Sequence, residues 1–202
     1  MNRDNFYPNV TTYGGKIVNR TLEKGGQIFR VFGPKGVTHG YQLPMDAFAG
    51  GNPERASKFW GMGGVPKNAK EWREYSGGVL DEWNHAGFIA VGTVEESGKI
   101  KACTGKIAEQ YGDKIPGQYL PGGGKQAMID TSADLAEQIN AVAAQVVQDG
   151  KVRTLSAGGY SWEIKPTGWK DANGIHGYDV VMLTAGVQTA KLGAREQASK
   201  ER

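Results

Sequence analysis

The sequence is poor in the residues that build disulfides and metal centres. It has one cysteine, Cys103, so no disulfide can form within the chain and the fold does not depend on an oxidising compartment. Its three histidines, His39, His85 and His176, stand far apart, and no cysteine–histidine pair has the spacing of metal ligands. We therefore expect no metal site and a protein suited to a cytosol-like reducing environment.

Charge of one sign and long apolar runs are also scarce. The 24 basic and 21 acidic residues are interspersed and leave a net charge of +3, which is too weak to argue for nucleic-acid binding. No run approaches the ~18 apolar residues that cross a membrane, and the polar residues 1–13 lack the core of a signal peptide. We expect neither nucleic acid nor membrane as a partner. If the protein leaves its cell, we expect secretion without a signal peptide or delivery into a target cell.

Several common catalytic motifs are missing. The sequence contains no G-x-S-x-G nucleophile elbow, no G-x-x-x-x-G-K-[ST] phosphate loop, and no strand followed by G-x-G-x-x-G and a helix. Cys103 alternates with Lys101 and Gly105 in a predicted strand, which favours a small core residue over a nucleophile.

Glycine, by contrast, is abundant at 31 residues, which favours a loop-rich β or α+β fold. The patterns predict strands at 16–19, 27–32, 88–94, 100–107, 126–130, 152–155, 160–164 and 178–184, helices at 52–59, 67–75 and 132–148, and a frayed helix from Lys191. We expect an extended lead-in over 1–25, a core over 26–130, and a C-terminal helix-and-strand addition over 131–202 packed on the same domain.

The first candidate functional segment is the strand Q-I-F-R-V-F and the loop that follows it. Arg30 lies on this strand, and its planar guanidinium suits a pair of phosphate oxygens. Gly33 lets backbone N–H groups approach the same anion, and Phe32 or Tyr41 could stack on a base or a nicotinamide ring. The alternative is an Arg30 paired with a carboxylate on a neighbouring strand, with ordinary glycine turns.

The second candidate is L-P-G-G-G-K-Q, residues 120–126. Consecutive glycines are costly to order, so Gly123 and Gly124 make sense where the chain passes close to a ligand or needs positive φ. Gln126 then enters a strand with an amide that both donates and accepts hydrogen bonds. The alternative is a flexible loop followed by a surface glutamine.

Together the two segments resemble a known family. The matching residues are Arg30, Phe32-Gly33, Gly40-Tyr41, Leu43-Pro44 and Pro121-Gly122-Gly123-Gly124-Lys125-Gln126, preceded by T-G-K-I-A-E-Q-Y-G at 104–112. In this order they resemble the NAD glycohydrolase domains of the tuberculosis necrotizing toxin type and related C-terminal domains of bacterial polymorphic toxins. The resemblance covers residues 26–130.

The resemblance implies an α+β fold with an ADP-ribosyltransferase-like mixed β-sheet core and short helices. It implies that Arg30 holds the phosphates of NAD(P)+ and that Gln126 occupies the position where transferases place a catalytic glutamate. We expect Phe32 and Trp83 to wall the nicotinamide ribose. A second family arginine has Arg55 or Arg73 as candidate counterparts in this sequence.

The expected function is therefore an NAD(P)+ glycohydrolase that acts as a toxin or effector, with no cofactor beyond its substrate and with a cognate immunity protein as partner. Transfer of ADP-ribose to a macromolecule is the first alternative, with Glu109, Asp113 or Asp130 as the carboxylate. The second is a non-enzymatic phage or secretion-apparatus module, since the five tryptophans are more often core or interface anchors than ligand platforms.

Overall fold

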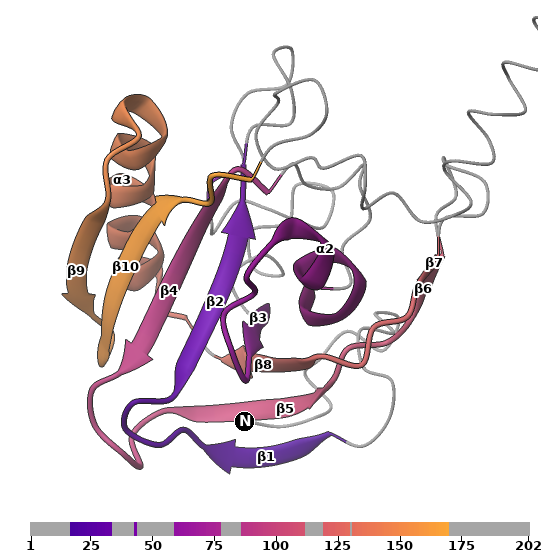
Figure 1. The fold of residues 1–202 in the computed structure, drawn as a ribbon. Coiled ribbons are helices and arrows are strands. Elements are labelled where there is room, and N and C mark those ends of the chain that lie inside the picture. The colour runs from indigo at the N-terminus through magenta and orange to yellow at the C-terminus, as the bar shows by residue number, and fades with distance from the viewer. Residues whose placement is uncertain are drawn as a thin grey trace, which may run out of the picture.

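The computed structural model describes residues 17–33, 43, 59–77, 86–111, 119–129 and 131–169. Eight strands form one sheet in the order β1-β5-β8-β3-β2-β4-β10-β9, and every neighbouring pair is antiparallel (Figure 1). The strands are β1 (Val18–Thr21), β2 (Gln27–Phe32), β3 (Phe59–Met62), β4 (Phe88–Val94), β5 (Lys101–Lys106), β8 (Lys125–Ile129), β9 (Arg153–Ala157) and β10 (Tyr160–Pro166). A separate ribbon pairs β6 (Gln110–Tyr111) with β7 (Tyr119–Leu120).

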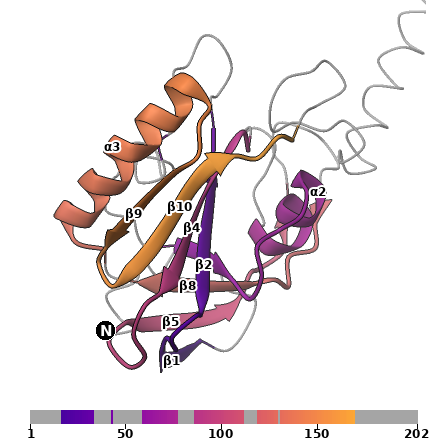
Figure 2. The ribbon, with the colours of Figure 1, turned by 60° about the vertical axis from the view of Figure 1, so that its left-hand side comes forward.

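The short strand β3 joins two halves of the sheet. Strands β1, β5 and β8 run across the direction of β2, β4, β10 and β9 in both views (Figures 1 and 2). Strand β3 pairs with β8 over its whole length, but with β2 only at Ile28↔Met62 and Phe29↔Gly61. Beyond Phe29, the strand register within the described residues joins β2 to β4. From Arg30 on, β2 is no longer in register with Phe59 and Trp60 of β3. We call this place, where the two strands diverge, the split.

One face of the sheet is covered by α3 (Ala133–Asp149), the helix predicted over 132–148. Its N-cap is Ser132, whose side-chain oxygen accepts from the Leu135 N–H at 3.2 Å, and Gly150 ends it with φ 69°. Its buried stripe packs on β9, β10 and the larger core cluster. The stripe consists of Leu135, Ile139, Ala143 and Val146.

The opposite face carries a short helical segment. Helix α2 (Ala69–Glu71) is capped by Asn68 and continues into a π-helix, η2 (Trp72–Gly77). A smaller apolar cluster beneath it includes Phe29, Val31 and Trp72. Figure 2 places α2 and α3 on opposite sides of the β2–β4–β10 half, so the sheet lies between them.

Several predictions are corrected here, while the α+β class itself is confirmed. Phe59, predicted to end a helix, begins β3, and β7 lies in a stretch for which no strand was predicted. The helix before Phe59, the strand at 178–184 and the tail from Lys191 lie outside the described residues. Strand β10 pairs with β4 along seven residues, so the segment after residue 130 extends the same sheet. Within the described residues, no helix is long and apolar enough to cross a membrane.

Candidate functional site

Arg30 lies at the split and spans it. Its side chain is 6% exposed, although it is a charged residue in the middle of a strand. Its Nη1 donates to the Phe59 carbonyl oxygen at 3.4 Å, and its Cζ lies 5.9 Å from the centroid of the Trp60 ring. The guanidinium therefore reaches a β3 carbonyl at the point where the β2–β3 ladder has stopped. The result is a cation held in one place between two diverging strands.

Aromatic side chains pack around Arg30 on the face covered by α3. The Trp60 ring lies 5.1 Å from that of Trp162, three strands further across the sheet. Gly92 makes this possible, because a Cβ there would lie 2.6 Å from the Trp162 ring. Phe32 is completely buried and stacks on Phe88 with centroids 5.6 Å apart. Phe32, which was predicted to contact the ligand, therefore lies in the main core, two residues after Arg30 on the same strand.

The end of β2 meets a strained segment. A Cβ on Gly33 would lie 2.7 Å from the Gly87 nitrogen, so this glycine is required by backbone contact. The neighbouring Ala86 has φ 57°, which an alanine rarely adopts. Thr167 fixes the segment by donating its hydroxyl to the Ala86 carbonyl at 2.9 Å. Backbone strain of this kind often occurs at functional sites, and no pattern in the sequence indicated it.

Gln126 is buried at 7% exposure and lies between two glycines. Its register partners are Gly61 on β3 and Gly105 on β5. The ring of Phe29 fills the space over Gly61, because a Cβ at that position would overlap it. Neither register partner of Gln126 therefore has a side chain, and the Phe29 ring covers one of the two positions.

The register places Arg30 and Gln126 on opposite faces of the sheet. Partners in an antiparallel pair point to the same face, and Gln126 is opposite Gly61, which is opposite Phe29. Arg30 follows Phe29 along the strand, so it points the other way and lies over Trp60. The structure brings both predicted residues to β3, one from each side, and does not bring them to one surface.

The N–H groups of the glycine turn before Gln126 donate to backbone carbonyls of the protein itself. The Gly122 N–H donates to the Glu74 carbonyl at 2.9 Å, and the Gly124 N–H to the Tyr75 carbonyl at 3.0 Å. The Gly123 N–H donates to the Ile107 carbonyl at 2.9 Å. Gly122 and Gly123 have φ of 65° and 87°. The N–H groups of Gly122 and Gly124 anchor the π-helix to the turn, and that of Gly123 bonds to Ile107, which explains the glycines without a bound anion.

A second buried arginine lies on the Gln126 face. Arg73 belongs to the π-helix, is 1% exposed, and has its Cζ 5.3 Å from the centroid of the Trp72 ring. The carbonyls of the next two residues hold the glycine turn that leads to Gln126. A π-helical turn is uncommon and is frequently found at functional sites. The sequence offered Arg73 as a candidate, but not its helix type or its burial.

The remaining candidates divide into described and undescribed residues. Glu109 is exposed and accepts a hydrogen bond from the Tyr119 hydroxyl at 3.1 Å, which raises the pKa of Tyr119. The predicted residues that lie outside the described ranges are Tyr41, Arg55, Trp83, Asp113 and Asp130.

Comparison with family models and with curated proteins gives no match to this sequence. Among solved structures, the chain is similar to one described as the structure of Tne2 in complex with Tni2. The identity is 15%, the match covers 59% of this chain and 84% of that chain, and the TM-score is 0.37. A TM-score of that size supports no conclusion about function. The function of the chain therefore rests on the motifs and the geometry described above.

Proposed function

We propose that this protein is an NAD(P)+ glycohydrolase that cleaves the nicotinamide–ribose bond, with the phosphates of the dinucleotide held by Arg30 at the split. The observation that carries the proposal is the position of Arg30, a buried guanidinium fixed between two diverging strands beside Trp60. A guanidinium matches the geometry of phosphate oxygens and keeps its charge when it is withdrawn from water. The sequence motifs around it resemble those of the toxin-type NAD glycohydrolases.

The reaction needs positioning more than acid catalysis. The glycosidic bond breaks through an oxocarbenium-like state, and nicotinamide leaves as a neutral group. The protein therefore has to hold the dinucleotide, favour the developing positive charge on the ribose, and admit water. Arg30 supplies the first of these. Gln126 lies on the other face of β3, and its proposed hydrogen bond to the ribose or the water rests on the resemblance of the motifs.

The proposal includes a biological role. We infer a toxin or effector that acts in a cytosol-like reducing environment, with an inhibitor protein in the producing cell. These parts rest on the resemblance of the motifs. The N–H groups of Gly123 and Gly124 already donate to carbonyl groups of the protein. The proposed role of these two glycines is therefore to position Gln126 and not to bind the ligand directly.

The test is release of free nicotinamide from NAD+ and from NADP+ by the purified protein. Arg30→Lys keeps the charge and removes the planar fork, and we expect kcat/KM to fall by about 100-fold, as for loss of one preorganised electrostatic contact. The matched control is Arg20→Lys, at an exposed arginine of β1, which should keep wild-type turnover. Near-ultraviolet circular dichroism checks that both variants are folded. Absence of wild-type turnover, or full turnover by Arg30→Lys, contradicts the proposal.

Gln126 needs its own experiment because it lies on the other face. Gln126→Ala should lower kcat while leaving the KM for NAD+ nearly unchanged, since the amide is proposed to act on the ribose and not on the phosphates. Gln138→Ala, at an exposed glutamine of α3, is the control. If labelled NAD+ leaves its label on a macromolecule and no free ADP-ribose accumulates, the reaction is transfer and not hydrolysis.

A further inference from the structure

Among the residues that the structure describes, strand β9 forms one edge of the sheet and lacks the usual protection of such an edge. It is last in the strand order, and its five residues pair with β10 without interruption, from Ala157↔Tyr160 to Arg153↔Ile164. It contains no proline and no bulge, the devices that commonly block pairing with another chain. The opposite edge strand, β1, is only four residues long and carries Arg20.

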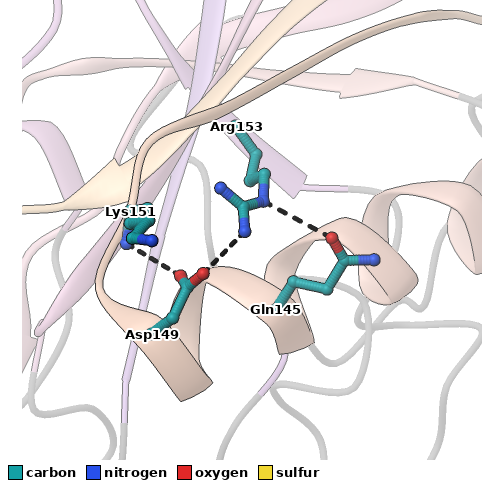
Figure 3. Close-up of polar contacts among 4 residues, drawn as sticks. All are labelled: Gln145, Asp149, Lys151 and Arg153. Atoms are coloured by element: carbon teal, nitrogen blue, oxygen red, sulfur yellow. Dashed lines mark hydrogen bonds and ion pairs between the residues drawn. The ribbon is translucent and has the colours of Figure 1, made fainter.

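The one charge on β9 is turned away from the edge. Arg153 donates from Nη2 to Asp149 Oδ2 at 2.6 Å and from Nε to Gln145 Oε1 at 3.4 Å, both on α3 (Figure 3). Asp149 is held in turn by the Lys151 backbone N–H at 2.9 Å. Just before the strand, Val152 is 53% exposed, which is unusual for a large apolar side chain beside a sheet edge.

The hairpin to β10 fixes which backbone groups face outward. Gly158 and Gly159 have φ of 65° and 80°, which is the two-residue turn that makes the flanking Ala157 and Tyr160 a hydrogen-bonded pair. Hydrogen-bonded and non-hydrogen-bonded pairs alternate along an antiparallel ladder. The N–H and C=O groups of Thr154 and Ser156 therefore point away from β10, toward the open edge.

We propose that two copies of this chain associate by antiparallel pairing of β9 about a two-fold axis at Leu155. In this register Thr154 faces the partner's Ser156, so the outward-facing backbone groups meet each other, and two hydroxyl side chains lie side by side. Arg153 faces the partner's Ala157, which keeps the two arginines from facing each other. Val152 faces the partner's Gly158.

The self-match of this strand is what identifies a second copy as the occupant. A strand of five residues supplies a two-fold register that leaves no like charges opposed and uses every outward-facing backbone group between Thr154 and Ser156. The pairing extends the eight-stranded sheet across both copies. Because so short a ladder buries less than the ~1,000 Å² of a standard interface, the association is weak and depends on protein concentration.

Sedimentation equilibrium of the full chain, from micromolar to millimolar concentration, tests the pairing. Ser156→Pro removes an outward N–H and leaves the bonds to β10 intact, and Ser156→Lys places a charge on the edge. Both also remove the hydroxyl that donates to Glu95 Oε1 at 3.1 Å within the same chain. Both should weaken association by about tenfold or more, because each acts at both symmetric pairs. The matched control is Ser161→Lys, which makes the same charge change opposite Ser156 on β10, one strand further in.

The expected result is a wild-type average mass that rises toward twice that of the monomer, a matching curve for Ser161→Lys, and a large shift toward monomer for both Ser156 variants. Circular dichroism of each variant checks the fold. A wild-type chain that stays monomeric throughout overturns the proposal. So does association of Ser156→Pro at wild-type strength, or an equal loss in Ser161→Lys.

Discussion

Replacing Gly124 by alanine should separate a structural role for the glycine turn from a ligand-binding one. A Cβ at Gly124 would lie 2.8 Å from the Ser76 Cα and closer still to the Tyr75 carbonyl oxygen. Both obstacles are backbone atoms, so no side chain can rotate out of the way. The π-helix has to move away from β8.

The cost follows from what that movement breaks. Forcing an extra methyl group into a packed site costs about 1–3 kcal/mol. The shift also weakens the hydrogen bonds from Gly124 to Tyr75 and from Gly122 to Glu74, at about 0.5–1.5 kcal/mol each. The lower unfolded-state entropy of alanine offsets about 0.4–1 kcal/mol. We expect a net loss of about 1–5 kcal/mol in the free energy of unfolding.

Urea denaturation followed by tryptophan fluorescence measures this loss as a lower midpoint at an unchanged slope. The control is Gly98→Ala, where φ is 83° and no atom would meet the new Cβ within 4 Å. Only backbone strain of about 1–2 kcal/mol applies there. If Gly124→Ala is no less stable than the wild type but loses NAD+ turnover, the glycine is kept for the ligand and the packing explanation is wrong.

Three further predictions concern single side chains. Tyr160→Phe should raise stability by about 1 kcal/mol, because the buried Tyr160 hydroxyl has no hydrogen-bond partner among the described residues; a thermal scan showing a loss of stability would reveal a partner. Ser132→Ala should cost about 1 kcal/mol in the same assay by removing the α3 N-cap, and an unchanged melting temperature would count against the cap. The pKa of Asp149 is lowered first by the hydrogen bond from the Lys151 backbone N–H and then by the charge of Arg153. The stability advantage of the wild type over Asp149→Asn should therefore be present above the ordinary aspartate pKa and disappear as pH falls through the lowered folded-state value. A pH-independent difference in urea midpoint would contradict this.

Local signals in the sequence were sufficient for α3. Ser132, the apolar stripe and Gly150 are all encoded within one segment, so capping and periodicity predict the helix nearly to the residue. Strand β2 was also predicted from its own residues. The burial of β2 on both faces could not be predicted, because it depends on α3 and α2, which cover the strand from either side.

Strand β3 shows what local patterns miss. The segment F-W-G-M has no alternation, and a helix was predicted up to its first residue. Its strand conformation comes from pairing with β8, more than sixty residues later in the chain, and Gly61 is needed there because the Phe29 ring lies over it. Without β3, the sequence could not reveal the split or the side of the sheet on which each residue lies.

The candidate site was predicted in part for the same reason. Arg30 and Gln126 were singled out from their segments, and both are buried polar residues beside β3. Their opposite faces follow from register through Gly61, which no local pattern encodes. The glycines before Gln126 were interpreted as room for a ligand or for positive φ. Gly122 and Gly123 have positive φ, and carbonyls of the π-helix accept the N–H groups of Gly122 and Gly124.

The central claim is that Arg30 at the split holds the phosphates of a dinucleotide whose nicotinamide bond the protein breaks. Its most direct test is the initial rate of nicotinamide release from NAD+ by folded wild-type protein and by Arg30→Lys at equal concentration. The account predicts steady release by the wild type and about a 100-fold lower kcat/KM for the variant. No release by the wild type, or equal rates for the two proteins, would contradict it.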